Sequence, residues 1–318
     1  MRRPYNFNID EISAFVHAVR HRSVSKASAV LGLPQPAVTR RIQGLEEALG
    51  IALLDRNTRP PGLTPQGARI YEQCTLLLRE SEKLASLATT EASAPDTFRI
   101  GMPQLAAEVL AVPVLTALRT AAPALSAQIS TGWSPDLADM IRAGELDAAL
   151  IIAPQLPALG AGVEAQAIGR FELVVITAQE GPALSASPTL RELASRPWIL
   201  NPDGCGFRRM LQQAFADANE VFSVGSDSFG TALQLELVAA GAGSGFVPRP
   251  LVEASAWRQR LRILDVPALS ATATLWRVQH TSTALPAGTL EVFRRAIDDA
   301  WAPLADTTSF SGSSRTPA

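Results

Sequence analysis

Residues 23–49 constrain the fold of this chain more than any other part of its sequence. They contain two segments with helical spacing of apolar residues, separated by a Gly-Leu-Pro turn. Ser23 is suited to cap the first helix, and Gly32 is suited to end it. Either Pro34 or Pro36 fits the first turn of the second helix, because a missing N–H breaks no helical hydrogen bond there. The stretch therefore predicts a tight helix–turn–helix.

The second predicted helix has one apolar and one polar face. The apolar stripe consists of Ala37, Val38, Ile42, Leu45 and Leu49. The opposite face carries the polar side chains of Gln35, Thr39, Arg40 and Gln43. These residue types hydrogen-bond phosphates and base edges, so the helix fits the major groove of DNA. An ordinary helical hairpin with a solvated polar face remains open on these residues alone.

Around this core the sequence resembles the LysR-type family of bacterial transcriptional regulators. The resemblance is carried by Phe15, by Ile42 and by residues 23–27, 31–32, 35–39, 45–50, 53–56 and 63–67. Mild departures occur at Arg22, Ser28 and Thr39. The resemblance implies that the chain binds double-stranded DNA, with contacts expected from Ser23, Lys26, Gln35, Pro36, Thr39, Arg40, Gln43, Arg56 and Arg59.

A hairpin wing is predicted after the helix–turn–helix. Residues 51–54 read as a short apolar strand, residues 56–62 as a polar turn, and residues 63–64 as the return strand. Arg59 lies near the predicted tip, where a guanidinium can enter a narrow minor groove. The family resemblance implies this role for Arg59, whereas Arg56 is expected to be a structural or phosphate partner.

A long helix is predicted from Pro65 to about Thr89. Small and apolar residues recur there in steps of four and three, the spacing of a coiled-coil seam: Ile70, Cys74, Leu77, Ser81, Leu84 and Ala88. The resemblance implies that this helix pairs two copies of the chain through Ile70, Leu77 and Leu84. The assembly is expected to be a homodimer or a homotetramer. A helix packed on its own domain is the alternative, and Cys74 is expected to be a small buried apolar residue.

Composition and charge favour a cytoplasmic protein. No apolar run approaches the roughly 20 residues of a membrane span, and the N-terminus lacks the apolar region of a signal peptide. The two cysteines predict no disulfide framework. Residues 1–65 hold nine Lys/Arg against five Asp/Glu, whereas the remaining residues hold nineteen against twenty-five. A basic head on an acidic body fits a DNA-binding protein, although chance also produces such an asymmetry.

From Thr97 onward, predicted strands and helices alternate, which favours a largely parallel sheet covered on both faces. Residues 163–168 and 171–177 read as two strands, and the helix over residues 105–121 is expected to break near Pro113. The resemblance implies two lobes like those of type 2 periplasmic binding proteins. The expected fold is α/β, with an all-α winged helix-turn-helix head, a long linker helix and a two-lobed, Rossmann-like regulatory domain. We expect the DNA-binding head at residues 1–65 and the linker helix with its hinge at 66–95. The effector-binding domain is expected at 96–303 and a disordered tail at 304–318.

Several predicted loops follow strands, where open α/β sheets bind ligands. The resemblance implies that these loops converge on a small-molecule effector, with contacts from Gln104, Thr131, Trp133, Cys205, Ser228, Phe229 and Pro248. Taken singly, each of these residues is better explained as capping a loop, so the expected site depends on their convergence. Cys205 precedes a predicted helix and two arginines, so a redox-sensing thiol and a neutral thiol lining the pocket are both open.

No enzyme motif is present: the three histidines lack metal-ligand spacing, and the sequence has no Gly-x-Ser-x-Gly, Gly-x-x-x-x-Gly-Lys-Ser/Thr or Gly-x-Gly-x-x-Gly. No catalytic residue, metal or other cofactor is expected. The resemblance implies an effector-responsive transcription factor that works with RNA polymerase. The alternative from another class is a solute-binding protein that has acquired a helical head.

Overall fold

In the computed structural model, the described residues are 6–21, 23–55, 62–88, 97–160, 162–181, 184–185, 187–281 and 285–304. The chain divides into two compact units, which are described separately. One contains the first 96 residues together with Arg142–Glu145, and the other contains Thr97–Ile141 and the chain from Leu146. The expected C-terminal tail lies outside the described residues, except for Leu304.

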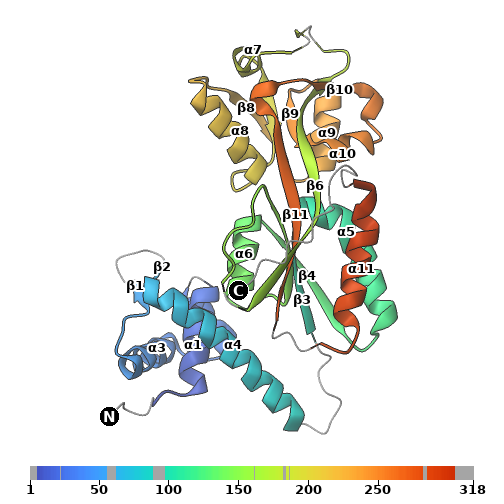
Figure 1. Ribbon diagram of the computed structural model, residues 1–318. Helices are drawn as coiled ribbons and strands as arrows, with labels where there is room; N and C mark the ends of the chain where they lie inside the picture. The colour runs from blue at the N-terminus through green and yellow to red at the C-terminus, as the bar shows by residue number, and fades with distance from the viewer. Residues whose placement is uncertain are drawn as a thin grey trace. The chain divides into compact units, whose positions relative to one another are not determined.

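The first unit begins with the predicted helices (Figure 1), which are α1 (Ile9–Arg20), α2 (Val24–Leu31) and α3 (Gln35–Leu49). The Ser23 side chain caps α2 by accepting a hydrogen bond from the Lys26 N–H at 3.2 Å, and Gly32 ends α2 with φ of +63°. Their apolar sides meet in one core that includes Ile12, Phe15, Val16, Ala27, Val38, Ile42, Leu45 and Leu53. The sequence therefore predicted this part of the chain correctly.

A hairpin follows α3, in which β1 (Leu54–Asp55) pairs antiparallel with β2 (Gly62–Leu63). The Glu46 carboxylate fixes the start of the hairpin. One of its oxygens accepts hydrogen bonds from the N–H groups of Leu53 at 2.8 Å and Leu54 at 3.2 Å. The predicted tip, with Arg56 and Arg59, lies outside the described residues.

The helix α4 (Pro65–Ala88) continues from the hairpin. Its first turn lies so close to the chain before β1 that a Cβ on Gly67 would lie 2.0 Å from the carbonyl oxygen of Leu53. Cys74 is buried in the core of the head, where burial raises the pKa of its thiol to about 11. Cys74 therefore belongs to the core of its own unit rather than to the predicted coiled-coil seam.

The second unit has two lobes (Figure 1). The first lobe contains β3 (Thr97–Pro103), α5 (Gln104–Ala121), β4 (Ser126–Gly132), α6 (Ser134–Arg142), β5 (Ala148–Ala153) and α11 (Thr289–Trp301). The second contains α7 (Leu190–Ala194), β7 (Pro197–Leu200), α8 (Gly206–Asp217), β8 (Ser223–Asp227), α9 (Thr231–Ala239), β9 (Gly245–Pro248), α10 (Arg249–Glu253) and β10 (Leu261–Leu264).

Two long strands, β6 (Val163–Ala178) and β11 (Ala271–His280), run through both lobes (Figure 1). The prediction of two separate strands over residues 163–177 was wrong, because Gly169 and Arg170 stay paired with β11 and keep the backbone extended. The sheet order is β10-β6-β11-β5-β3-β4, with β9 also pairing with β6. Among the described residues of this sheet, only the pairs β3–β4 and β3–β5 are parallel. The expectation of a largely parallel sheet was therefore wrong.

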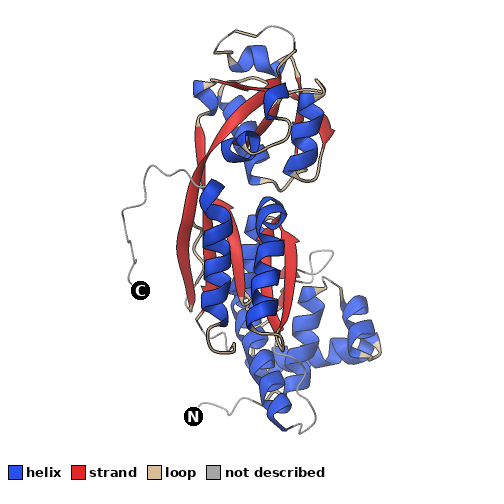
Figure 2. Ribbon diagram, turned by 90° about the vertical axis from the view of Figure 1, so that its right-hand side faces the viewer, coloured by secondary structure: helices blue, strands red, loops and turns tan. Residues whose placement is uncertain are grey.

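Helices α5 and α11 lie side by side along the first lobe (Figure 2). The helix α5 is uninterrupted, contrary to prediction, because Pro113 lies on its exposed side, where water can satisfy the carbonyl that the proline leaves unpaired. By length and composition α5 is also apolar enough to cross a membrane. Five of its residues instead pack into the largest apolar core of the unit: Leu105, Ala106, Leu110, Val114 and Leu118.

Candidate functional site

The helix α3 presents the polar surface that the sequence predicts for a DNA reader. Val38, Ile42 and Leu45 are buried against the other helices of the head. The residues expected to contact DNA lie exposed along the rest of the helix, namely Gln35, Pro36, Thr39, Arg40 and Gln43. The helix begins with Pro34 as its N-cap, so Pro36 occupies the first turn. This arrangement leaves the N-terminal half of α3 accessible to a duplex.

Two adjacent arginines on α3 differ in their partners. The Arg41 guanidinium forms an ion pair with Asp10 of α1 at 2.8 Å. Arg40 forms no hydrogen bond or ion pair within the described part of the chain. The Thr39 hydroxyl donates to the carbonyl oxygen of Gln35 at 3.1 Å. Arg40 is thus available to an outside partner, whereas Arg41 holds two helices together.

The residues predicted for dimerisation lie on α4. Ile70 is half-buried, whereas Leu77 is 48% exposed and Leu84 is 70% exposed. Large apolar side chains this exposed on one helix leave apolar surface uncovered in a single chain, and covering it with a second copy would be favourable.

The predicted effector residues lie where strands and helices of the second unit meet. Gln104 begins α5, Thr131 lies in β4, and Trp133 immediately precedes α6. In the second lobe, Cys205 is the N-cap of α8, Ser228 and Phe229 precede α9, and Pro248 ends β9. Ser228 and Pro248 are buried, whereas Phe229 is 74% exposed.

The structure brings one of these side chains directly across to the other lobe. Trp133 lies against Gly204, where an added Cβ would be 2.5 Å from the indole Nε1. Gly204 also has φ of +101°, a conformation that a residue with a Cβ rarely adopts. The indole therefore packs directly on the backbone of the loop that leads into α8.

A second contact between the lobes involves Glu108, which the sequence did not indicate. Its carboxylate oxygens accept a hydrogen bond from the Thr231 N–H at 3.2 and 3.4 Å. The neighbouring Gly230 N–H donates to the Asn201 side chain at 3.0 Å. The only available signal was that Glu108 lies four residues after Gln104, and so on the same side of a predicted helix.

The loop before α8 is held by Arg208. Its guanidinium contacts the Asp203 carboxylate at 3.0 Å and the Asp227 carboxylate at 2.6 Å, and it donates to the Asn201 carbonyl oxygen at 3.2 Å. The Arg208 side chain is only 12% exposed, so these contacts are partly shielded from water. They fix the loop that faces Trp133.

Cys205 has a neutral thiol in this environment. Burial raises its pKa, and this effect outweighs the N–H groups of Arg208 and Phe207 and the nearby arginine charges, which lower it. A redox-sensing cysteine needs accessible thiolate character. Of the two interpretations open from sequence, the surroundings of Cys205 favour a thiol that lines or supports the site.

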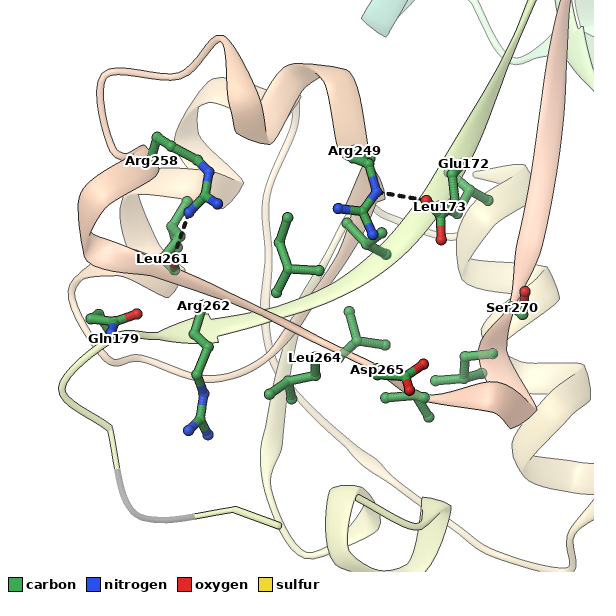
Figure 3. Close-up of a pocket in the computed structure, with 15 residues that line it drawn as sticks. Glu172, Leu173, Gln179, Arg249, Arg258, Leu261, Arg262, Leu264, Asp265 and Ser270 are labelled. Carbon is green, nitrogen blue, oxygen red and sulfur yellow. Dashed lines mark hydrogen bonds and ion pairs between the residues drawn. The ribbon is translucent and has the colours of Figure 1, made fainter. Parts of the chain in front are cut away.

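A separate cavity of about 530 Å³ lies in the second lobe beside β6 and β10 (Figure 3). Its charged lining includes Glu172, Asp265, Arg249, Arg258 and Arg262. Arg249 is engaged by Glu172 at 2.6 Å, while Arg262 points away from that pair in the figure. None of the predicted effector residues lines this cavity.

Comparison with known proteins decides the family. The bacterial regulatory helix-turn-helix protein, lysR family, matches residues 9–68, and the LysR substrate binding domain matches residues 92–302. The chain is a LysR-type transcriptional regulator. LysR-type regulators bind DNA through the helix-turn-helix and carry an effector-binding domain, and they are not enzymes.

Similar LysR-type proteins match along most of the chain. HTH-type transcriptional regulator BbuR of Bordetella bronchiseptica is 29% identical over 235 residues, covering 74% of this chain and 72% of that protein. A probable hydrogen peroxide-inducible genes activator of Mycobacterium avium is 29% identical over 275 residues, with 84% and 86% covered. A full-length OxyR variant from Pseudomonas aeruginosa shares the fold, with a TM-score of 0.61 at 21% identity over 92% of this chain and 98% of that one.

Proposed function

We propose that this LysR-type regulator reads its operator with the exposed face of α3 and changes its DNA binding when a small molecule enters between the lobes of the second unit. The observation that carries the DNA-binding part is the separation of α3 into two faces. Val38, Ile42 and Leu45 are buried, while Gln35 and Arg40 are exposed. Arg40 can therefore reach base edges without breaking a contact within the head.

The remaining DNA contacts of the proposal come from Ser23, Lys26, Pro36, Thr39 and Gln43, and from Arg56 and Arg59 of the wing. The Ser23 hydroxyl caps α2 by accepting a hydrogen bond from the Lys26 N–H, so it can still donate one to a phosphate. Arg59 is proposed to enter the minor groove beside the site, where a narrow A·T-rich groove attracts a guanidinium.

The proposed effector site lies between the lobes, around Gln104, Thr131, Trp133, Cys205, Ser228, Phe229 and Pro248. The contact between Trp133 and Gly204 supports this site, because it brings a side chain of the first lobe against the backbone of the second lobe. The Ser228 hydroxyl is buried and has no hydrogen-bond partner within the described residues. An aromatic wall favours an effector with an apolar or aromatic portion over a bare inorganic ion.

The proposed assembly is a homodimer or homotetramer paired through α4, with Ile70, Leu77 and Leu84 at the seam. The exposure of Leu77 and Leu84 supports this seam. We place the head at residues 1–65, the linker at 66–95 and the effector domain at 96–303. The protein acts in the cytoplasm, where its DNA and RNA polymerase are found.

A thermal-shift screen of the full-length protein tests the effector site. A panel of aromatic and aliphatic metabolites is expected to contain a stabiliser, since a ligand at 100 times its dissociation constant adds about 2.7 kcal/mol to the stability of the state that binds it. Trp133→Ala should abolish that shift. Trp257→Ala should retain it, because Trp257 stacks on Arg260 and is not among the predicted effector residues. A ligand that stabilises both variants equally would contradict the proposed site.

A further inference from the structure

Two glycines of the second lobe are each touched by a side chain from the first lobe. Gly204 lies under Trp133, and Gly230 lies under Glu108, where an added Cβ would be 2.5 Å from the carboxylate Oε1. Both glycines have positive φ, +101° and +91°. The lobes therefore meet at two points where the second lobe presents backbone without a side chain.

The contact at Gly230 places a carboxylate at the beginning of a helix. Thr231 is the first residue of α9, and its N–H has no carbonyl partner within the helix. Glu108 supplies the missing acceptor from α5, which lies 123 residues earlier in the chain. A negative charge at this end of a helix is also favoured by the aligned peptide dipoles.

The surroundings of Glu108 act on its carboxyl group in two opposite directions. The residue as a whole is exposed, but partial burial of its carboxyl group raises the pKa of that group, and this is the largest effect on it. Hydrogen bonds from the Thr231 N–H and the Gln104 side chain act in the opposite direction. The carboxylate thus has two donors, one from each lobe.

We propose that Glu108 is a built-in latch between the lobes, which caps α9 and holds the two lobes together when no effector is bound. The inference rests on the proposed function, in that the latched cleft is the effector site. The resting position of the lobes is set by the contact between Glu108 and Thr231. An effector acts on this equilibrium by its different affinity for the latched and released arrangements.

The latch is tested through Trp133, which lies at the other contact between the lobes and does not depend on Glu108 for a hydrogen bond. Its emission is isolated as the difference between each protein and the same protein carrying Trp133→Phe. In Glu108→Ala, this emission is expected to shift to longer wavelength, and quenching by acrylamide is expected to increase, because the indole loses its cover at Gly204.

Glu236→Ala is the matched control, because it removes an exposed carboxylate from α9 without touching the first-turn N–H groups. It should leave the Trp133 emission unchanged. Glu108→Gln keeps an acceptor oxygen but loses the charge, so its shift should be smaller than that of Glu108→Ala. If Glu108→Ala fails to fold, the same comparison between Glu108→Gln and Glu236→Ala decides the question.

An unchanged Trp133 emission in a folded Glu108 variant would overturn the latch. So would an equal shift in Glu236→Ala. The measurement uses the full-length protein without effector or DNA. A screen that finds no effector therefore does not contradict the latch. An unchanged Trp133 emission contradicts the latch but not the proposed effector site, which the thermal-shift screen tests.

Discussion

Replacing Arg40 by alanine should weaken base recognition at one position of the operator while leaving the fold of the head intact. Arg40 is exposed on α3 and has no partner within the described residues. Surface substitutions of this kind usually change the free energy of unfolding by no more than about 0.5 kcal/mol. The melting temperature of the head should therefore stay close to that of the unaltered protein.

The expected loss in binding follows from the chemistry of a guanidinium in the major groove. A bidentate contact to a guanine discriminates by about 1–3 kcal/mol, which corresponds to roughly 5- to 150-fold in affinity for each head. The loss should appear on the specific duplex. Binding to a scrambled duplex depends mainly on phosphate contacts and should fall much less.

The neighbouring residue provides the control. Arg41→Ala breaks the 2.8 Å ion pair with Asp10, whose two side chains are 32% and 67% exposed. Exposed pairs contribute about 0–1 kcal/mol to stability, so this variant should be slightly less stable but still discriminate. Fluorescence anisotropy with both duplexes at one salt concentration measures these affinities. Equal losses on both duplexes for Arg40→Ala, or equal loss of discrimination in the two variants, would refute base contact by Arg40.

Three further outcomes are expected. Leu77→Glu should convert the oligomer to monomers in sedimentation velocity, because it places like charges together in the proposed seam; an unchanged oligomer would locate the seam elsewhere. Gly67→Ala should lower the melting temperature, because the added Cβ would lie 2.0 Å from the Leu53 carbonyl oxygen. The cost of relieving this clash exceeds the gain of about 1 kcal/mol in helix propensity. A higher melting temperature would contradict the close packing. Both cysteines should resist iodoacetamide at pH 8 in the folded protein, because burial raises both thiol pKa values and keeps the thiols protonated; labelling as fast as in urea would contradict this.

The head was predictable because its determinants are local. The Ser23 cap, the Gly32 termination and the spacing of Val38, Ile42 and Leu45 all lie within one short stretch, and each agrees with the others. The polar face of α3 followed directly from that spacing. The wing tip with Arg59 lies outside the described residues, so its proposed role remains a prediction.

The sheet of the second unit was less predictable because its pairing is not local. Alternating strands and helices usually indicate parallel strands, but β6 and β11 run through both lobes and pair antiparallel. Glu108 was missed for the same reason, because its partner Thr231 is 123 residues away. On a predicted helix such a carboxylate is indistinguishable from an ordinary solvated one.

A footprint on the DNA upstream of the protein's own coding region tests the central claim most directly. The full-length protein is measured with and without the metabolite that raises its melting temperature most. If the protein is a sequence-specific regulator controlled by an effector, it should protect a defined DNA site, and the length of that site or the affinity for it should change with the metabolite. The footprint of the Trp133→Ala protein should not respond to the metabolite. A footprint that is identical with and without every stabilising metabolite would contradict effector control of DNA binding.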